Sequence, residues 1–421
     1  MDLLILKALS ERQRFKSLQH AVPNGMVSPD TQAMLAWFSA YYNTFPERER
    51  VDVDELVSLV RLRAGSATQE QIALTLHLCD QLRTPIEASS LQGIISSLYE
   101  LDLSGKAGAL IARYNNSEEI DLAYELSTLS AEARRAMVDG TKSAWADRPI
   151  LEYLEDDNDE GGLQWNSFPQ LALNLKGLRK GDNVALCAPT DQGKTSLLCR
   201  LMVDFQVQAQ HIYPGRPALY LVNEGTQERI TARMYQTAVQ LQRDDLLVLA
   251  REGTLEQRYA GIIGGRDMIR VANIHGKSMA QVANIIERHS PHLVVSDMTG
   301  RIRATSNRGG GANDIGQLEE VWNGFRELAV LQDFAHMGTV QVSAEGFNML
   351  YPPLSALQNS KTGIQTTLDL VLMMGALTNP DAATLRGIST PKNKLGRSGK
   401  LSQNMFQSYF DAPINRWDTG T

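Results

Sequence analysis

The sequence contains few cysteines. Its 421 residues include three, Cys79, Cys187 and Cys199, and their spacing is not that of a metal site. A small secreted scaffold held by disulfides is therefore excluded. Two of the three cysteines lie in a segment with the pattern of a buried strand and helix, so we expect buried thiols.

Long apolar runs are also missing. No stretch approaches the roughly 20 apolar residues that a membrane-spanning helix requires. Residues 1–9 are apolar, but they have no basic leader and are followed closely by Glu11 and Arg12, so we expect a helix and not a secretion signal. We therefore predict a cytoplasmic protein, in a host cell's cytoplasm if a phage encodes it, without a membrane partner.

The chain has no excess of positive charge. Its net charge is −7, from 41 Lys and Arg residues and 48 Asp and Glu residues. A surface coated with basic residues is excluded, so any nucleic acid must be held locally. The apolar content of 43% and the charged content of 21% are ordinary for a globular protein, and 421 residues suffice for two or three domains.

Three segments differ in pattern. Residues 1–145 are predicted to be helical, with a helix start at Ser28-Pro29 and capping-box spacing at Thr68 and Gln71. Residues 146–163 form an acidic linker with one short helical turn, and we expect its carboxylates to repel one another and keep it extended. Residues 164–421 make up the third segment, in which the pattern changes.

Strands and helices alternate in this third segment. Such alternation predicts an α/β domain whose mostly parallel sheet is covered by helices, preceded here by an all-α domain. Short apolar runs predict strands near 183–187, 218–223, 269–273, 292–297, 338–343, 369–374 and 386–390.

The first of these strands leads into a Gly-Lys-Thr turn and a helix. Residues 188–195, Ala-Pro-Thr-Asp-Gln-Gly-Lys-Thr, are a variant of the phosphate-binding loop with alanine in the first position. The free N–H groups of the helix favour an anion, Lys194 reaches the β and γ phosphates, and Thr195 ligates Mg²⁺. The alternative is that this turn occurs by chance, but the predicted strand before it and the predicted helix after it make that less favourable. We predict a cradle for ATP and Mg²⁺ made of Ala188, Asp191, Gln192, Gly193, Lys194, Thr195 and Ser196.

Two further strands end in carboxylates. Asp297 ends the strand near 292–297 and is predicted to hold Mg²⁺, directly or through water. Glu224 follows the strand near 218–223 and is predicted to activate the attacking water as a general base. Alternatives stay open, because an aspartate after a strand also forms caps and turns, and a glutamate is favoured near a helix N-terminus.

From residue 162 to the C-terminus, the chain resembles the bacterial and phage replicative DNA helicases of the DnaB family. The resemblance rests on residues 162–171, Gly177-Leu178 with Asp182, Glu224 followed by Arg233-Met234, and Lys392-Asn393-Lys394-Leu395-Gly396. It implies a RecA-like motor, assembled as a homohexameric ring, that uses ATP to translocate 5′ to 3′ on single-stranded DNA. Residues 1–145 are similar in architecture to the family's collar.

The resemblance assigns roles to residues late in the chain. Lys392 and Lys394 match a segment that reaches into a neighbouring subunit's nucleotide site. Lys394 replaces the family's finger arginine, so either it serves or Arg397 substitutes for it; a solvated basic turn is the alternative. The family's sensor glutamine falls on Glu345, which donates no amide hydrogen bond to a phosphate when ionised.

The predicted DNA contacts lie in two loops. Arg301, Arg303 and Arg308 come shortly after Asp297 and are followed by the glycine run 309–311. Such a loop suits the phosphates of a single strand. Lys361 is a lesser candidate, in a segment that resembles the family's second DNA-facing loop. The alternative is a plain surface loop.

These features together predict a replicative DNA helicase that unwinds duplex at the fork. A primase and a helicase loader are further partners that the resemblance implies. Two alternatives remain: a RecA-like recombinase or regulatory DNA-dependent ATPase, and a non-enzymatic platform for primase or loader. Intact Lys194, Thr195, Asp297 and Glu224 speak against the platform.

Overall fold

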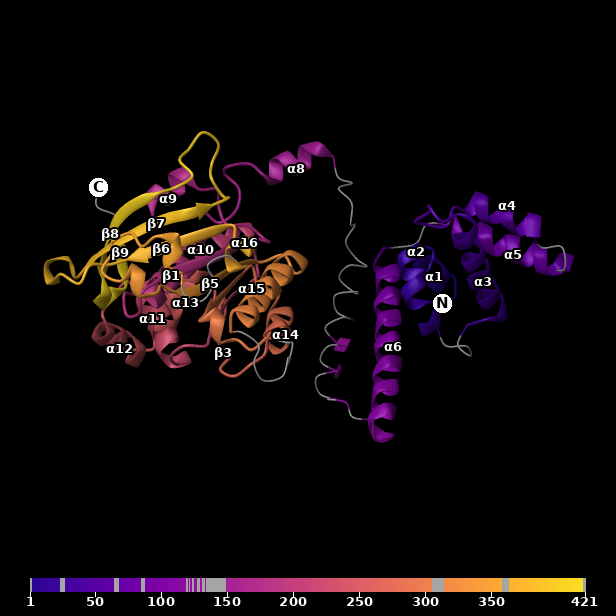
Figure 1. Ribbon diagram of the computed structural model, residues 1–421, viewed down its shortest axis with the longest axis horizontal. Coiled ribbons are helices and arrows are strands. Elements are labelled where there is room, and N and C mark those ends of the chain that lie inside the picture. The colour runs from indigo at the N-terminus through magenta and orange to yellow at the C-terminus, as the bar shows by residue number, and fades with distance from the viewer. Residues whose placement is uncertain are drawn as a thin grey trace. The chain divides into compact units, whose positions relative to one another are not determined.

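The computed structural model divides the chain into two compact units, residues 1–147 and 148–421 (Figure 1). The structure describes residues 2–22, 27–63, 68–84, 88–118, 149–304, 314–357 and 363–418, with a few positions between 120 and 133.

The described part of the first unit is helical, as predicted. Ser28 caps α3 through its side chain, and Thr68 and Gln71 form the expected capping box at α5. The rings of Phe15, Phe38 and Tyr42 pack together in its core. The elements are α1 (Asp2–Ala8), α2 (Arg12–Leu18), η1 (Gln19–Ala21), α3 (Pro29–Thr44), α4 (Val53–Arg63), α5 (Gln69–Leu82) and α6 (Ala88–Asn115).

The described part of the second unit is built on a nine-stranded sheet of order β3-β2-β4-β5-β1-β6-β7-β8-β9. Strands β1 to β6 are parallel to one another, and β7, β8 and β9 extend the sheet beyond β6 by antiparallel pairing. The predicted, mostly parallel sheet is confirmed. The strands are β1 (Asn183–Ala188), β2 (Ala218–Val222), β3 (Ile269–Asn273), β4 (Leu293–Asp297), β5 (Ala335–Gln341), β6 (Leu370–Gly375), β7 (Leu385–Asn393), β8 (Met405–Asp411) and β9 (Arg416–Asp418).

Helices cover both faces of this sheet. One core joins the sheet to α10, α11 and α13, and another joins it to α14 and α15 (Figure 1). The helices are α8 (Ile150–Asp156), α9 (Pro169–Asn174), α10 (Lys194–Ile212), α11 (Gln227–Val239), α12 (Arg243–Arg251), α13 (Leu255–Ile263), α14 (Met279–His289), α15 (Asp314–Leu331) and α16 (Gly363–Thr367). The 3₁₀ turns are η2 (Thr299–Arg301), η3 (Ala344–Gly346), η4 (Leu354–Ala356), η5 (Pro380–Ala382) and η6 (Ala412–Ile414).

The acidic segment is largely exposed, as expected of a solvated spacer, but two of its carboxylates pair with basic residues. After α8, Asp157 Oδ1 lies 2.8 Å from Lys176 Nζ, and Glu160 Oε1 lies 2.8 Å from Arg397 Nη1. Cations of the second unit thus neutralise these carboxylates, so self-repulsion does not govern this segment.

The three cysteines are buried free thiols, as predicted. Burial raises the pKa of both Cys187 and Cys199 to about 12, which keeps them protonated. In the parts of the chain that the structure describes, no helix is long and apolar enough to span a bilayer.

Candidate nucleotide-binding site

Strand β1 and helix α10 position the predicted phosphate loop. Ala188 is the buried last residue of β1, and Gly193 is the N-cap of α10. Asp191 and Gly193 have φ values of 58° and 99°, in the left-handed region that lets the chain turn sharply. The unpaired N–H groups at the start of α10 consequently face the end of the sheet where parallel strands bind ligands.

A cavity of about 480 Å³ lies over this loop. It brings together four cations, Lys194, Arg229, Arg233 and Arg386, with only two carboxylates, Asp191 and Glu224. The surplus of cations suits an anionic ligand such as a nucleoside triphosphate. The predicted residues that line it are Asp191, Gly193, Lys194, Thr195, Ser196 and Glu224.

Asp297 is fully buried at the end of β4, directly beside the phosphate loop. Its Oδ2 accepts hydrogen bonds from Thr195 Oγ1 at 2.8 Å and from the Tyr220 hydroxyl at 2.7 Å, and its Oδ1 accepts one from Thr339 Oγ1 at 2.9 Å. No cation pairs with Asp297 among the described residues.

This environment fits a magnesium ion. A buried carboxylate whose partners are all neutral hydroxyl groups lacks the charge compensation that burial requires. The oxygens of Thr195 and Asp297 are the hard ligands that Mg²⁺ prefers, and the expected phosphate position adjoins them. Burial, together with the nearby carboxylate, raises the pKa of the Tyr220 phenol well above its ordinary value, so this partner stays a neutral donor.

Glu224 faces the same cavity from the segment after β2. Its Oε2 lies 3.8 Å from Lys194 Nζ, and its Oε1 lies 3.3 Å from Arg301 Nη2. The side chain is 34% exposed, so water reaches the carboxylate. Arg301, predicted as a DNA contact, therefore also contacts the predicted general base.

Several cavity residues were not predicted as site residues. Arg233 Nη1 donates to Ser196 Oγ, and Gln341 lines the cavity from the end of β5. Arg386 Nε donates to the Gln192 carbonyl at 2.8 Å. Arg233 carried a signal, because it belongs to the Arg-Met pair on which the family resemblance rests. Arg386 gave no such signal, because nothing in the local sequence of its strand relates it to the phosphate loop.

The predicted finger residues lie at the other end of the sheet. Lys394 Nζ lies 3.6 Å from Asp369 Oδ1, and Asp369 Oδ2 accepts the N–H of Asn183, the first residue of β1. Lys392 Nζ donates to the Gln365 carbonyl. The phosphate loop follows the last residue of β1, roughly 16 Å away at the usual rise per residue. Neither lysine therefore reaches the cavity of its own chain.

Arg397 forms hydrogen bonds to three residues of its own chain. Its guanidinium donates to the Leu175 carbonyl at 2.9 Å, to Glu160 at 2.8 Å and to Gln164 Oε1 at 2.7 Å. These hydrogen bonds join Arg397 to the acidic segment and to the residues just after it. Its role as the substitute finger, which would act on a neighbouring chain, stays a prediction.

The predicted sensor, Glu345, and the predicted DNA contacts do not line the cavity in the same way as the cradle residues. Glu345 is exposed on η3 and is not a lining residue, because the chain turns away after β5; Gln341 occupies the cavity wall instead. Arg303 is exposed at the end of the described part of its loop. Arg308 and Lys361 lie outside the described residues.

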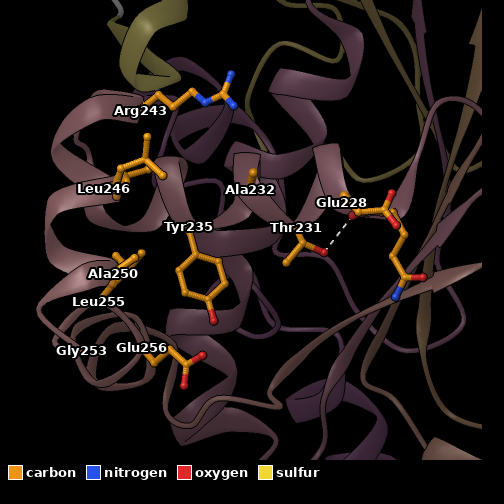
Figure 2. A pocket seen from close by; sticks show the side chains of 12 residues that line it. Glu228, Thr231, Ala232, Tyr235, Arg243, Leu246, Ala250, Gly253, Leu255 and Glu256 are labelled. Atoms are coloured by element: carbon orange, nitrogen blue, oxygen red, sulfur yellow. Dashed lines mark hydrogen bonds between the residues drawn. The ribbon is translucent and has the colours of Figure 1, made fainter.

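A second cavity, of about 820 Å³, lies among α11, α12 and α13 (Figure 2). Leu246, Ala250 and Tyr235 project into it from these helices, with Glu228 and Arg243 at its margin. It is larger than the first cavity, but it contains neither the phosphate loop nor Asp297. We therefore assign nucleotide chemistry to the smaller cavity.

Two of the histidines, His292 and His336, are buried in the core. No group of three or more His, Cys, Asp or Glu side chains suited to a metal occurs among the residues described. Burial lowers the pKa of both His292 and His336 to about 3, so their rings are neutral. Their role in the described structure is hydrogen bonding inside the core.

Solved structures of other proteins share this architecture. A solved structure of a DnaB-like replicative helicase, reported with its interactions with primase, aligns over 100% of this chain and 99% of its own, with a TM-score of 0.54 and 13% identity. The chain has the fold of a DnaB-like replicative helicase. A second solved structure, of an isolated ATPase domain, aligns over 65% of this chain and 96% of its own, with a TM-score of 0.53 and 15% identity.

The sequence comparisons are narrower. A family model described as AAA domain matches residues 149–346, which include the phosphate loop and Asp297. No curated protein gives a significant match to this sequence. The predicted RecA-like fold is confirmed, and the resemblance to the DnaB family is confirmed as a resemblance of fold.

Proposed function

We propose that the protein is an ATP-dependent DNA helicase that assembles as a homohexameric ring and moves on single-stranded DNA. One observation carries the proposal: Lys194, Thr195 and Glu224 meet at one cation-rich cavity, with Asp297 bonded directly to Thr195. The DnaB-like fold supports the same assignment. The direction of movement, 5′ to 3′, rests on the family resemblance.

Each residue has a defined task in this mechanism. Lys194 and the N–H groups at the start of α10 bind the phosphates. Thr195 and Asp297 would hold Mg²⁺, which when bound would supply positive charge beside the phosphates. Glu224 orients the attacking water and accepts its proton, since its carboxylate is open to solvent at the cavity wall.

The neighbouring subunit completes the site in this proposal. Lys392 and Lys394 lie at the opposite sheet end from their own cavity. In the proposed ring they exchange their contacts with Gln365 and Asp369 for the site of an adjacent chain. A cation delivered there stabilises charge in the transition state, as an arginine finger does. Assembly in a ring would give every cavity such a partner.

DNA binding is proposed for the loop that follows Asp297. Arg301 contacts Glu224, so a strand that pulls on this loop changes the surroundings of the general base. Arg303 and Arg308 are proposed as backbone contacts, with Lys361 in a second loop. A primase and a loader are proposed as partners on the family resemblance alone.

The test is ATP hydrolysis by the full chain with Mg²⁺, with and without single-stranded DNA. We expect Lys194→Ala to lower turnover by roughly 10²–10³-fold, because a fixed charge on the phosphates is lost. Lys180→Ala is the matched control, since this lysine is 61% exposed and lies outside the cavity. Normal turnover in Lys194→Ala would contradict the motor assignment.

The same preparation separates the alternatives. Electron microscopy with an ATP analogue and DNA distinguishes a ring from the filament of a recombinase. A forked duplex tests strand separation, which Arg303→Ala with Arg308→Ala should abolish while basal turnover persists. A folded wild-type chain without turnover would favour the non-enzymatic platform.

A further inference from the structure

A C-terminal hairpin packs against the phosphate loop. Strands β8 and β9 place Phe410 and Trp417 in a stack with centroids 4.5 Å apart, and Phe410 lies so close to Gly193 that a Cβ there would meet its Cε1 at 3.3 Å. Asn415 Nδ2 donates to the Ser196 carbonyl at 3.0 Å. The start of α10 is therefore braced by the end of the chain.

Arg386 is the charged member of this brace. It is 7% exposed, and its guanidinium carbon lies 5.6 Å from the centre of the Phe410 ring. Its Nε donates to the Gln192 carbonyl at 2.8 Å, and its Nη1 donates to the carbonyls of Ala383 at 2.8 Å and Leu385 at 2.9 Å.

The guanidinium has no charge partner in the described structure. No carboxylate forms an ion pair with Arg386 among the described residues, and its Nη2 makes no hydrogen bond to any of them. Burial lowers the pKa of Arg386, as expected for a cation that is removed from water without a negative partner. Because Arg386 also lines the cavity, an anion there would supply the missing partner.

The hydrogen bond to Gln192 acts on the loop itself. In a trans peptide the C=O and the following N–H point in opposite directions. Holding the Gln192 carbonyl therefore fixes where the Gly193 N–H points, at the turn that cradles phosphate.

We infer that Arg386 is a positioning residue for the phosphate loop and a second fixed cation of the cavity, which favours the diphosphate part of a nucleotide. This inference rests on the proposed function, because it deepens the same site. It assigns the strand before the finger segment a task within its own chain, separate from the task proposed for Lys394 in the neighbouring one.

The experiment measures binding of MgADP to the full chain by calorimetry. Arg386→Gln should weaken affinity roughly 10- to 100-fold, because hydrogen bonds from a charged group are lost. The MgADP affinity of Arg386→Lys should lie between those of wild type and Arg386→Gln, because lysine keeps the charge but lacks the planar guanidinium group. Arg416→Gln is the control: this arginine is on the same hairpin but is 51% exposed and paired with Asp418.

The outcomes are distinct. MgADP affinity within twofold of wild type in folded Arg386→Gln overturns the inference, as does an equal loss in Arg416→Gln. If Arg386→Gln does not fold, Arg386→Lys is judged by the same twofold limit. A wild-type chain that binds no MgADP overturns the proposed function and the inference together, whereas normal wild-type binding with unaffected variants overturns the inference alone.

Discussion

Glu224 holds two cations on one carboxylate. Lys194 lies 3.8 Å from one oxygen, and Arg301 lies 3.3 Å from the other. A bound triphosphate competes with Glu224 for Lys194, because the ammonium group interacts more strongly with the larger negative charge. We therefore expect nucleotide binding to free Glu224 from Lys194, so that it can orient the attacking water as proposed.

We expect Glu224→Gln to bind MgATP at least as tightly as wild type and to hydrolyse it roughly 10²–10⁴-fold more slowly. Glutamine no longer competes for Lys194, and it accepts no proton. Nucleotide titration and single-turnover hydrolysis measure the two effects. Glu228→Gln, in the first turn of α11, is the control and should change neither. Loss of binding in Glu224→Gln would mean that the carboxylate supports local structure.

The sequence was most informative where neighbours along the chain share one task. Lys194 and Thr195 follow a strand in a contiguous motif, and Asp297 and Glu224 are recognisable because parallel strands end at one edge. Arg386 bonds to a residue 194 positions earlier. No local pattern specifies that contact, since it depends on how the terminal hairpin packs.

Buried polar side chains join strands β1, β4 and β5. His336 Nδ1 bonds to Asn183 Oδ1 at 2.7 Å, and its Nε2 bonds to Ser296 Oγ at 2.9 Å. All three residues are fully buried, and the ring stacks on Phe325 at 3.9 Å. The neutral ring thus satisfies a polar group on each neighbouring strand.

Replacing this ring should destabilise the sheet. We expect His336→Leu to lower the free energy of unfolding of the second unit by about 2–4 kcal/mol at pH 7, because two buried polar groups lose their partner. Urea denaturation measures the change. His275→Leu, at an exposed position, should have little effect. A change below about 0.5 kcal/mol in His336→Leu would contradict the role given to the network.

The same variant gives a pH prediction. The pKa of His336 is lowered to about 3 in the folded chain, so the unfolded chain binds more protons between that pH and about 6.5. Stability from the neutral ring is therefore present above pH 6.5 and declines by about 1.4 kcal/mol per pH unit below it. The difference between wild type and His336→Leu should shrink as pH falls; a constant difference would contradict the assignment.

His336 also explains a missed strand boundary. Strand β5 begins at Ala335, three positions before the predicted start at 338, because a polar histidine does not indicate a buried strand. Strands β8 and β9 were not predicted at all. Phe406, Ser408 and Phe410 do alternate inward along β8, but a serine in that series weakens the apolar signal. Antiparallel additions at a sheet edge follow from packing more than from local pattern.

The sheet separates the two regions to which we assign the cradle and the finger. The phosphate loop follows the last residue of β1, whereas Lys394 contacts Asp369 beside the first residue. This separation was not predictable from the motif, which gives no strand register. Within the proposed ring, it means that each chain offers a cradle at one end of its sheet and a finger at the other.

Lys394→Ala should therefore lower hydrolysis on the order of 10³-fold while nucleotide still binds to the intact cradle. The loss has its physical cause in an adjacent chain, because the side chain does not reach its own cavity. Turnover and nucleotide affinity of the assembled protein measure it. Lys400→Ala, an exposed lysine six positions later, is the control and should hydrolyse ATP normally.

Mixed assemblies show where the finger acts. Chains with Lys194→Ala lack a working cradle and chains with Lys394→Ala lack a finger, so assemblies of either chain alone should be nearly inactive. Mixing them creates one interface with an intact cradle and an intact finger, and hydrolysis should recover in proportion to that interface. The control mixes Lys194→Ala with the double variant that carries both Lys194→Ala and Lys394→Ala. No chain in this mixture has an intact cradle, so hydrolysis should not recover. Absence of recovery in verified mixed rings would mean that each site is complete within a single chain.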